Sequence, residues 1–298
     1  MSRIRIGTRG SALAQWQAEH VGARLAALGH EVERCVITTT GDRLLDRRLE
    51  SVGGKGAFLK EIEEAMQAGE VDLAVHSLKD VPGVLPPGLS LIAVLERADP
   101  RDALLSAGKR LAELPAGGNV GTTSLRRQAL LRALRPDLVL ADLRGNVDTR
   151  LLRLREGRFD AIVLAMAGLT RLGREGEVSE ALDPREFVPA PGQGAIALEC
   201  RDDDAAVRDA VAPLGHGPTA HAVAAERAFL VALGGGCNVP LGAHAFAANG
   251  SLELVAFVGA AAGPALLRGV RRGSDPERLG RDLAEDLRSQ GADALLGR

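Results

Sequence analysis

The strongest constraint on this fold is a repeated alternation of strand-like and helix-like segments. Short apolar runs typical of strands lie at 3–7, 31–38 and 71–77. Segments with helical spacing of apolar residues lie between them, at 11–28 and 57–69. Strands that alternate with helices in this way predict an α/β domain built on a mainly parallel sheet.

A second alternating unit follows, with strands expected at 119–122, 138–143 and 159–165 and helices at 124–135 and 147–157. A Pro/Gly segment, 189–195, precedes a strand at 195–200, where we expect the chain to return to the first domain. The remainder predicts a small α+β domain, with helices at 219–233 and 276–290 around three strands, 239–246, 251–259 and 265–272.

The length favours more than one domain, because single cores stop growing beyond roughly 250–300 residues. We expect three domains: lobe 1 from 1–96 plus 194–214, lobe 2 from 97–193, and a C-terminal domain from 215–298. No apolar run has the length of a membrane span, and MSRIRIGTRG has no signal-peptide pattern. The three cysteines lack CxxC spacing. These features predict a cytoplasmic protein with reduced thiols and no membrane contact.

Composition argues against a nucleic-acid partner. The net charge is −2, and aromatic residues, which stack on single-stranded bases, make up 2% of the chain. The basic residues are nevertheless unusual, since 4 of the 37 are lysines and the other 33 are arginines. Arginine grips carboxylates and phosphates with two parallel donors, so the positions of the arginines matter more than their number.

Several arginines follow predicted strands. Arg126 and Arg127 begin the helix after strand 119–122, and Arg144 and Arg150 lie at the next strand–helix junction. Helix N-termini attract anions, and ligands of α/β sheets collect at the carboxyl ends of strands. A polyanion site is therefore one interpretation. A solvated helix face is expected for Arg132, Arg135, Arg153, Arg155 and Arg158.

The first domain offers a matching junction. Arg9 and Ser11 precede the helix at 11–28, where capping alone explains the serine. Asp80, in HSLKDVP, suits a turn as well as a catalytic carboxylate. For His76 we expect a structural role. VGGKGAF lacks the phosphate-loop pattern and predicts a glycine-rich lid with one cation. No metal site is visible.

Cys237 lies behind three glycines in LGGGCNVPLG, where another molecule can approach a nucleophilic thiol closely. A cysteine hydrolase would need a histidine, and His216, His221 and His244 are candidates by proximity alone. A purely structural cysteine is the alternative. Cys35 and Cys200 lie in strand-like apolar runs and are expected in the core.

Nine stretches together resemble the porphobilinogen deaminase (hydroxymethylbilane synthase) family, in the family's order and from Arg3 to the final helix. They are GTRGSALA, VGGKGAF, VHSLKDVP, ERADPRDA, GTTSLRRQ, LRGNVDTR, GLTRLG, PGQGA and ERAFLVALGGGCNVPLG. VHSLKDVP and GGGCNVP are the most specific. Gly10 and Gly234 depart from the residues common in the family, and neither matches a residue of the chemistry.

The resemblance implies a fold of two periplasmic-binding-protein-like lobes and a small α+β domain that bears Cys237. It also implies that Cys237 holds a dipyrromethane primer through a thioether. Four porphobilinogen units are then joined head to tail on this primer, with ammonia released at each addition. Water finally frees hydroxymethylbilane and leaves the primer in place.

Residue roles are implied by the same match. The cofactor-binding positions, besides Cys237, are Lys79, Asp80, Ser124, Arg126, Arg127 and Arg144. The substrate-binding positions are Arg9, Ser11, Lys55, Phe58, Arg144, Arg150 and Arg171, although Phe58 suits a helix core equally well. Asp80 matches the catalytic aspartate, which stabilises the azafulvene cation left by the loss of ammonia and handles protons.

The expected partners are porphobilinogen, as the substrate, and uroporphyrinogen-III synthase, which receives the product. The enzyme itself is expected to be a monomer. Two alternatives from other classes stay open at this point. A two-lobed binding protein for a small anion would share the lobes and the arginines but would need neither Asp80 nor Cys237. A cysteine hydrolase would never carry a pyrrole.

Overall fold

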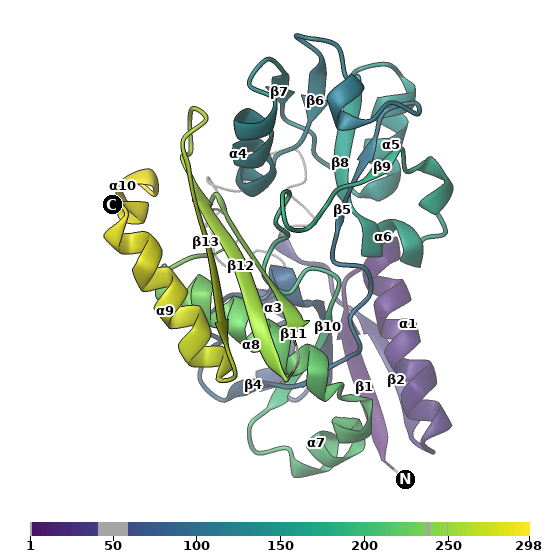
Figure 1. Cartoon of the computed structure of the whole chain (residues 1–298). Helices are drawn as coiled ribbons and strands as arrows, with labels where there is room; N and C mark the ends of the chain where they lie inside the picture. The colour runs from purple at the N-terminus through teal and green to yellow at the C-terminus, as the bar shows by residue number, and fades with distance from the viewer. Residues whose placement is uncertain (1, 41–58, 237–238, 249) are drawn as a thin grey trace. The chain divides into compact units, whose positions relative to one another are not determined.

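The computed structural model describes residues 2–40, 59–236, 239–248 and 250–298 (Figure 1). The chain divides into two compact units. Unit 1 comprises Met1–Ala98 and Ala195–Ala220, and unit 2 comprises Asp99–Gly194 and His221–Arg298. Each unit is described by itself below.

Unit 1 contains a five-stranded sheet formed by described residues, in the order β2-β1-β3-β10-β4. The strands are β1 (Arg3–Thr8), β2 (Glu31–Val36), β3 (Leu73–Ser77), β4 (Leu89–Val94) and β10 (Ile196–Arg201). β1 is parallel to β2 and β3, whereas β10 is antiparallel to both of its neighbours, β3 and β4. Four strands therefore run in one direction, which confirms the predicted mainly parallel sheet.

Helices α1 (Ala12–Ala27), α3 (Lys60–Gln67) and α7 (Ala205–Val211) pack on this sheet. Val21 and Leu25 of α1 share a core with Ile4, Ile6 and Leu198 from the strands. Two 3-10 helices, η2 (Leu78–Asp80) and η5 (Ala212–Leu214), follow β3 and α7. The sequence of α8 (Gly217–Ala232) then runs from unit 1 into unit 2.

Unit 2 repeats the same strand arrangement in the order β7-β6-β8-β5-β9. β6 is parallel to β7 and β8, and β5 is antiparallel to β8 and β9. The strands are β5 (Asp102–Leu105), β6 (Asn119–Gly121), β7 (Val139–Ala141), β8 (Ala161–Ala165) and β9 (Glu180–Ala181). The helices are α4 (Leu125–Leu134), α5 (Val147–Arg155), α6 (Met166–Arg171), η3 (Leu111–Glu113) and η4 (Glu175–Glu177).

The C-terminal part of unit 2 is an antiparallel sheet of β11 (Leu241–Ala248), β12 (Ser251–Gly259) and β13 (Leu266–Gly273). The last long helix, α9 (Pro276–Ser289), lies along this sheet, and α10 (Ala292–Leu295) follows it (Figure 1). Gly269 permits the close approach, because a Cβ there would lie 2.7 Å from Cδ1 of Leu283. The predicted α+β arrangement is confirmed.

Both faces of β12 are buried. Leu254, Ala256 and Val258 pack in the core under α9, while Val255 and Phe257 belong to the core of α4 and its sheet. Successive residues of a strand point to opposite faces, so one strand joins two cores. This explains why the C-terminal strands belong to the same compact unit as β5–β9. The predicted three-domain boundaries stay a prediction.

Sequence periodicity located the long elements within a few residues but missed β4, β5 and β9. β9 has two residues and β5 has four buried ones, and such short runs cannot be assigned by periodicity. β4 is a half-buried edge strand whose apolar run LSLIAV does not alternate. No helix among the described residues has both the length and the hydropathy of a membrane span.

Candidate active site

Two neighbouring strands of unit 1 end at predicted catalytic, cofactor-binding and substrate-binding residues. Arg9 and Ser11 lie between β1 and α1, and Lys79 and Asp80 lie in η2, directly after β3. Because β1 and β3 are parallel neighbours, their carboxyl ends meet at one edge of the sheet. The structure therefore brings these four residues to the same edge.

A cavity of about 70 Å³ opens at this edge. Arg9, Ser11 and Asp80 all contribute to its wall. Its other polar residues are Gln17, His76 and Ser77. Ser11 Oγ also accepts a hydrogen bond from the backbone N–H of Ala14, with an N–O distance of 3.4 Å, so the predicted helix cap is confirmed. Three predicted site residues thus share one cavity, and Lys79 lies beside it in sequence.

The predicted site residues of unit 2 follow three parallel strands that are neighbours in its sheet. Ser124 caps α4 after β6, Arg144 and Arg150 lie at the β7–α5 junction, and Arg171 ends α6 after β8. β7, β6 and β8 are adjacent and parallel, so these junctions share the carboxyl edge of the sheet. In both units the predicted residues gather where an α/β sheet binds ligands.

Arg126 and Arg127, in the first turn of α4, are buried against an acid that the sequence analysis did not assign. Arg126 Nη2 lies 2.7 Å from Asp102 Oδ2, and Arg127 Nη2 lies 2.7 Å from Asp102 Oδ1. Each guanidinium also donates to a backbone carbonyl, Arg126 to Val188 at 2.7 Å and Arg127 to Val163 at 2.8 Å. The three side chains form a buried ionic cluster.

The charges of this cluster do not cancel. Burial alone would raise the pKa of Asp102, but Arg126 and Arg127 outweigh it and hold that pKa below its usual range. Burial lowers the pKa of the Arg126 guanidinium, and Arg127 adds to the effect, while Asp102 opposes it. Two guanidiniums and one carboxylate carry one net positive charge, which an anionic ligand would balance.

Gln193 completes the surroundings of Asp102. Its Nε2 donates to Asp102 Oδ1 at 3.1 Å and to the Pro100 carbonyl at 2.8 Å. Neither Asp102 nor Gln193 was a candidate in the sequence analysis. The sequence feature that could have pointed to Asp102 is its position, since it is a charged residue at the start of the apolar run DALL.

Two of the remaining predicted arginines donate to defined backbone carbonyls. Arg150 Nε donates to the carbonyl of Gly145 at 2.8 Å, and Arg171 Nη2 donates to that of Gly194 at 2.7 Å. Burial lowers the pKa of the Arg171 guanidinium to about 10, which leaves it charged at neutral pH. Arg144 is half-buried. Gly145 needs its φ of +106°, and a Cβ there would lie 2.8 Å from Thr149 Cγ2.

The expectation for the other arginines was partly wrong. Arg135 does not lie on a solvated face, because it pairs with Asp137 at 2.7 Å and donates to the carbonyls of Leu111 and Leu114. The backbone of η3 and of Leu114, the residue that follows it, accepts these hydrogen bonds. Arg155 and Arg158 are solvated as predicted, with side chains 58% and 64% exposed.

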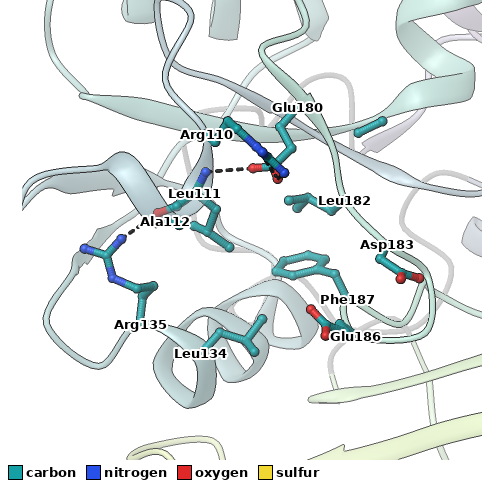
Figure 2. A pocket seen from close by; sticks show the side chains of 11 residues that line it. Arg110, Leu111, Ala112, Leu134, Arg135, Glu180, Leu182, Asp183, Glu186 and Phe187 are labelled. Carbon is teal, nitrogen blue, oxygen red and sulfur yellow. Dashed lines mark hydrogen bonds and ion pairs between the residues drawn. The ribbon is translucent and has the colours of Figure 1, made fainter.

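A larger cavity of about 380 Å³ lies at the other end of α4, where Leu134 and Arg135 are found (Figure 2). Figure 2 shows Phe187 and Leu182 on its floor and Glu180 beside Arg110 on its rim. Its two arginines face acidic partners, and its rim also contains Asp183 and Glu186. This acidic rim does not suit a polyanion.

The predicted histidine and cysteine roles have different outcomes. His76 is buried with its Nε2 2.8 Å from Glu199 Oε2, which confirms a structural contact. His244 contacts Glu226 and His216 contacts Thr219. Cys200 is buried as predicted, and burial raises the pKa of its thiol to about 11. Cys35 is only half-buried, because it lies on the edge strand β2.

Three predicted site residues, Lys55, Phe58 and Cys237, lie outside the described residues. Within the described ranges, no group of three His, Cys, Asp or Glu side chains is arranged to hold a metal ion.

The fold and the site define an α/β protein with two similar mixed sheets, whose strand ends gather arginines and the exposed Asp80. Among solved structures, it is similar to the methionine-binding protein MetQ, with 14% identity over 76% of this chain and 94% of that chain and a TM-score of 0.44.

Family comparison gives the particular assignment. Residues 4–209 match the family described as "Porphobilinogen deaminase, dipyromethane cofactor binding domain", and residues 220–289 match "Porphobilinogen deaminase, C-terminal domain". The porphobilinogen deaminase of Roseiflexus sp. is 54% identical over 98% of this chain and 97% of its own length. The porphobilinogen deaminase of Syntrophobacter fumaroxidans is 52% identical over 98% of this chain and 96% of its own length. The chain belongs to the porphobilinogen deaminase family.

Proposed function

We propose that this chain joins four porphobilinogen units head to tail on a dipyrromethane primer and releases hydroxymethylbilane by hydrolysis. It is accordingly a deaminating transferase of tetrapyrrole biosynthesis. The observation that carries the proposal is the gathering of charged side chains at the carboxyl ends of the parallel strands in each unit. Arginines gather at these strand ends in unit 2, and Arg9, Lys79 and the exposed carboxylate Asp80 lie at those of unit 1.

The side chains present fit the dipyrromethane group. Each of its pyrroles carries carboxylates, and the cluster of Arg126, Arg127 and Asp102 holds one net positive charge at a helix N-terminus. When bound, the group supplies the pyrrole carbon to which the first substrate unit is joined. We assign its binding to Cys237, as the covalent anchor, and to Lys79, Asp80, Ser124, Arg126, Arg127 and Arg144.

Arg9, Ser11 and Asp80 suit the substrate because they line one cavity. A guanidinium and a hydroxyl bind a carboxylate of porphobilinogen, while the Asp80 carboxylate stabilises the positive charge that develops as ammonia leaves. The same carboxylate accepts the proton displaced when the new carbon–carbon bond forms. We assign the other substrate contacts to Lys55, Phe58, Arg144, Arg150 and Arg171.

The partners, the oligomeric state, the location and the domain boundaries belong to the same proposal. The substrate is porphobilinogen, and the product passes to uroporphyrinogen-III synthase. The enzyme acts as a monomer in the cytoplasm. Its three domains are 1–96 plus 194–214, 97–193 and 215–298.

The intact mass of the purified protein tests the proposal. The wild type should exceed its polypeptide mass by two condensed pyrroles, and Cys237→Ser should not. Cys200→Ser is the matched control and should keep the added mass. Incubation with porphobilinogen should then add further pyrrole units to the wild type only, one at a time.

A binding protein for a small anion predicts a different result. Its wild type and its Cys237→Ser variant would both have the bare polypeptide mass, and neither would gain covalent mass from porphobilinogen. That outcome would overturn the proposed function. Bare wild-type protein that gains pyrroles on incubation would instead be an enzyme purified without its primer, and would support it.

A further inference from the structure

The side chain of Arg298 contacts the C-terminal end of helix α8. Its Nη1 donates to the carbonyl of Leu233 at 2.5 Å, and its Nη2 donates to the carbonyl of Gly234 at 3.1 Å. Both carbonyls follow the last residue of α8, Ala232. A helix C-terminus carries a partial negative charge and carbonyls without intrahelical partners, so a guanidinium is favourable there. Arg298 therefore closes the exit of this helix.

The turn beside Arg298 is a Schellman motif with a glycine in the left-handed conformation. Gly235 N–H donates to the carbonyl of Leu230 and Gly234 N–H donates to that of Val231, both at 2.8 Å. Gly234 has a φ of +56°, and a Cβ there would lie 2.8 Å from Arg298 Nη1. This gives a physical reason for Gly234, which departs from the residue common in the family.

The segment that carries Arg298 is packed into a core. Ala292 is fully buried, and Leu295 and Leu296 pack against the core cluster that also contains Leu233. The backbone N–H of Arg298 donates to a carbonyl of α10 at 2.9 Å. The guanidinium is therefore presented to the end of α8 from a backbone that is itself held in place.

Packing along the glycine run changes between Gly235 and Gly236. A Cβ on Gly235 would lie 2.7 Å from Leu230 Cδ1 and 3.1 Å from Leu241 Cδ2. A Cβ on Gly236 would meet no heavy atom of the described residues within 4 Å. Cys237 comes next in the sequence and lies outside the described residues. The closely packed part of the run thus ends two residues before the thiol.

We propose that Arg298 is a positioning residue for the primer, because it fixes the point from which the segment bearing Cys237 departs. The inference rests on the proposed function, in which Cys237 is the covalent anchor. The primer and every pyrrole joined to it extend from this point, and a misplacement of about 1 Å can cost about 10²-fold in rate. Arg298 acts through the carbonyls of Leu233 and Gly234, and touches neither primer nor substrate.

Two variants of Arg298 and one control test the contact. Arg298→Ala removes both donors, whereas Arg298→Lys keeps the charge but loses the planar fork that reaches two carbonyls. Arg278→Ala is the matched control, because it removes an arginine of α9 whose side chain is 75% exposed. Arg298 is also exposed, so all three variants should fold.

Amide hydrogen exchange without substrate is the first measurement. The N–H groups of Gly234 and Gly235 exchange when the turn opens, and mass spectrometry follows them in peptides that cover 230–236. Arg298→Ala should accelerate this exchange about tenfold, because two hydrogen bonds from a charged donor are lost. Arg298→Lys should lie between Arg298→Ala and the wild type, and Arg278→Ala should match the wild type.

Steady-state kinetics is the second measurement, on preparations whose primer mass equals that of the wild type. A displaced primer impairs the alignment of the reacting carbons and leaves the binding of the incoming porphobilinogen intact. Arg298→Ala should therefore lower kcat about three- to tenfold and keep KM within about twofold. Arg298→Lys should restore part of kcat. A merely structural arginine would lower the melting temperature and leave the kcat of loaded protein unaltered.

Either of two results overturns the inference. Wild-type exchange of the Gly234 and Gly235 amides in Arg298→Ala would mean that the guanidinium does not hold the turn. Faster exchange with a wild-type kcat would mean that the turn does not position the primer. The exchange measurement needs no substrate, so it tests the contact even when porphobilinogen adds no mass to the wild type and the proposed function fails.

Discussion

Asp102 Oδ1 accepts two hydrogen bonds from one guanidinium, at 3.0 Å from Nε and 2.7 Å from Nη2 of Arg127, and both side chains are buried. Hydrogen bonds between two ionised groups are roughly twice as strong as those between neutral groups. Asp102 Oδ2 pairs with Arg126, so one carboxylate orients two guanidiniums at the start of α4.

Asp102→Asn should therefore destabilise the protein strongly. The substitution leaves two buried guanidiniums without their counter-charge, a change that costs about 3–5 kcal/mol in buried ion pairs. Urea unfolding at neutral pH measures the loss. Asp286→Asn, which breaks a solvent-exposed pair with Arg271, is the control and should change the unfolding free energy far less.

The effect of Asp102 should also depend on pH. Its pKa is lower in the folded protein, so its contribution is complete above the unfolded pKa and is lost as pH falls through the folded one. The difference in unfolding free energy between the wild type and Asp102→Asn should accordingly become smaller in strong acid. Equal stabilities of the two proteins at neutral pH would contradict the ionic cluster.

Arg144→Gln tests the arginines at the strand ends of unit 2. If Arg144 binds a substrate carboxylate, loss of this charged contact removes about 1.5–3 kcal/mol, which corresponds to roughly tenfold or more in KM for porphobilinogen. Steady-state kinetics measures the change. Arg155→Gln, whose side chain is 58% exposed on α5, removes the same charge and should leave KM unaltered. A similar KM in both variants would argue against an anion site at the β7–α5 junction.

Asp80→Asn separates catalysis from folding. Asp80 is exposed at the end of η2, so its amide should fold with an unchanged melting temperature. Loss of a proton-handling carboxylate should lower kcat by about 10²–10⁴-fold. The primer mass is measured first on the same preparation, because only primer-loaded protein reports on kcat. Full activity of loaded Asp80→Asn would exclude this carboxylate from the reaction.

The three thiols provide a test that needs no substrate. Burial raises the pKa of Cys200 to about 11, and it also raises that of Cys35. Neither forms much thiolate at neutral pH, and iodoacetamide should label the native protein slowly. In denaturant, Cys35 and Cys200 should react fully while Cys237 is blocked by its thioether. Peptide mass spectrometry gives the outcome, and complete labelling of Cys237 in primer-loaded protein would contradict the thioether anchor.

Local chemistry predicted most of the elements and many of the site positions. Helical periodicity located α1, α4 and α5, and the capping serines Ser11 and Ser124 marked two helix starts. Because the ends of parallel neighbouring strands meet at one edge, the strand–helix alternation also predicted one anion site at the junctions of Arg126, Arg127, Arg144 and Arg150. Motif resemblance pointed to Asp80 and Cys237.

Only the tertiary structure decided which charges meet. Asp102 lies 24 residues before Arg126 in the sequence, and no periodicity links them; sheet pairing and helix packing bring them to 2.7 Å. His76 and Glu199 are 123 residues apart and meet because β10 returns to pair with β3. Burial then sets their energetics, since the same carboxylate that is solvated on an exposed loop must find a donor or a proton inside a core.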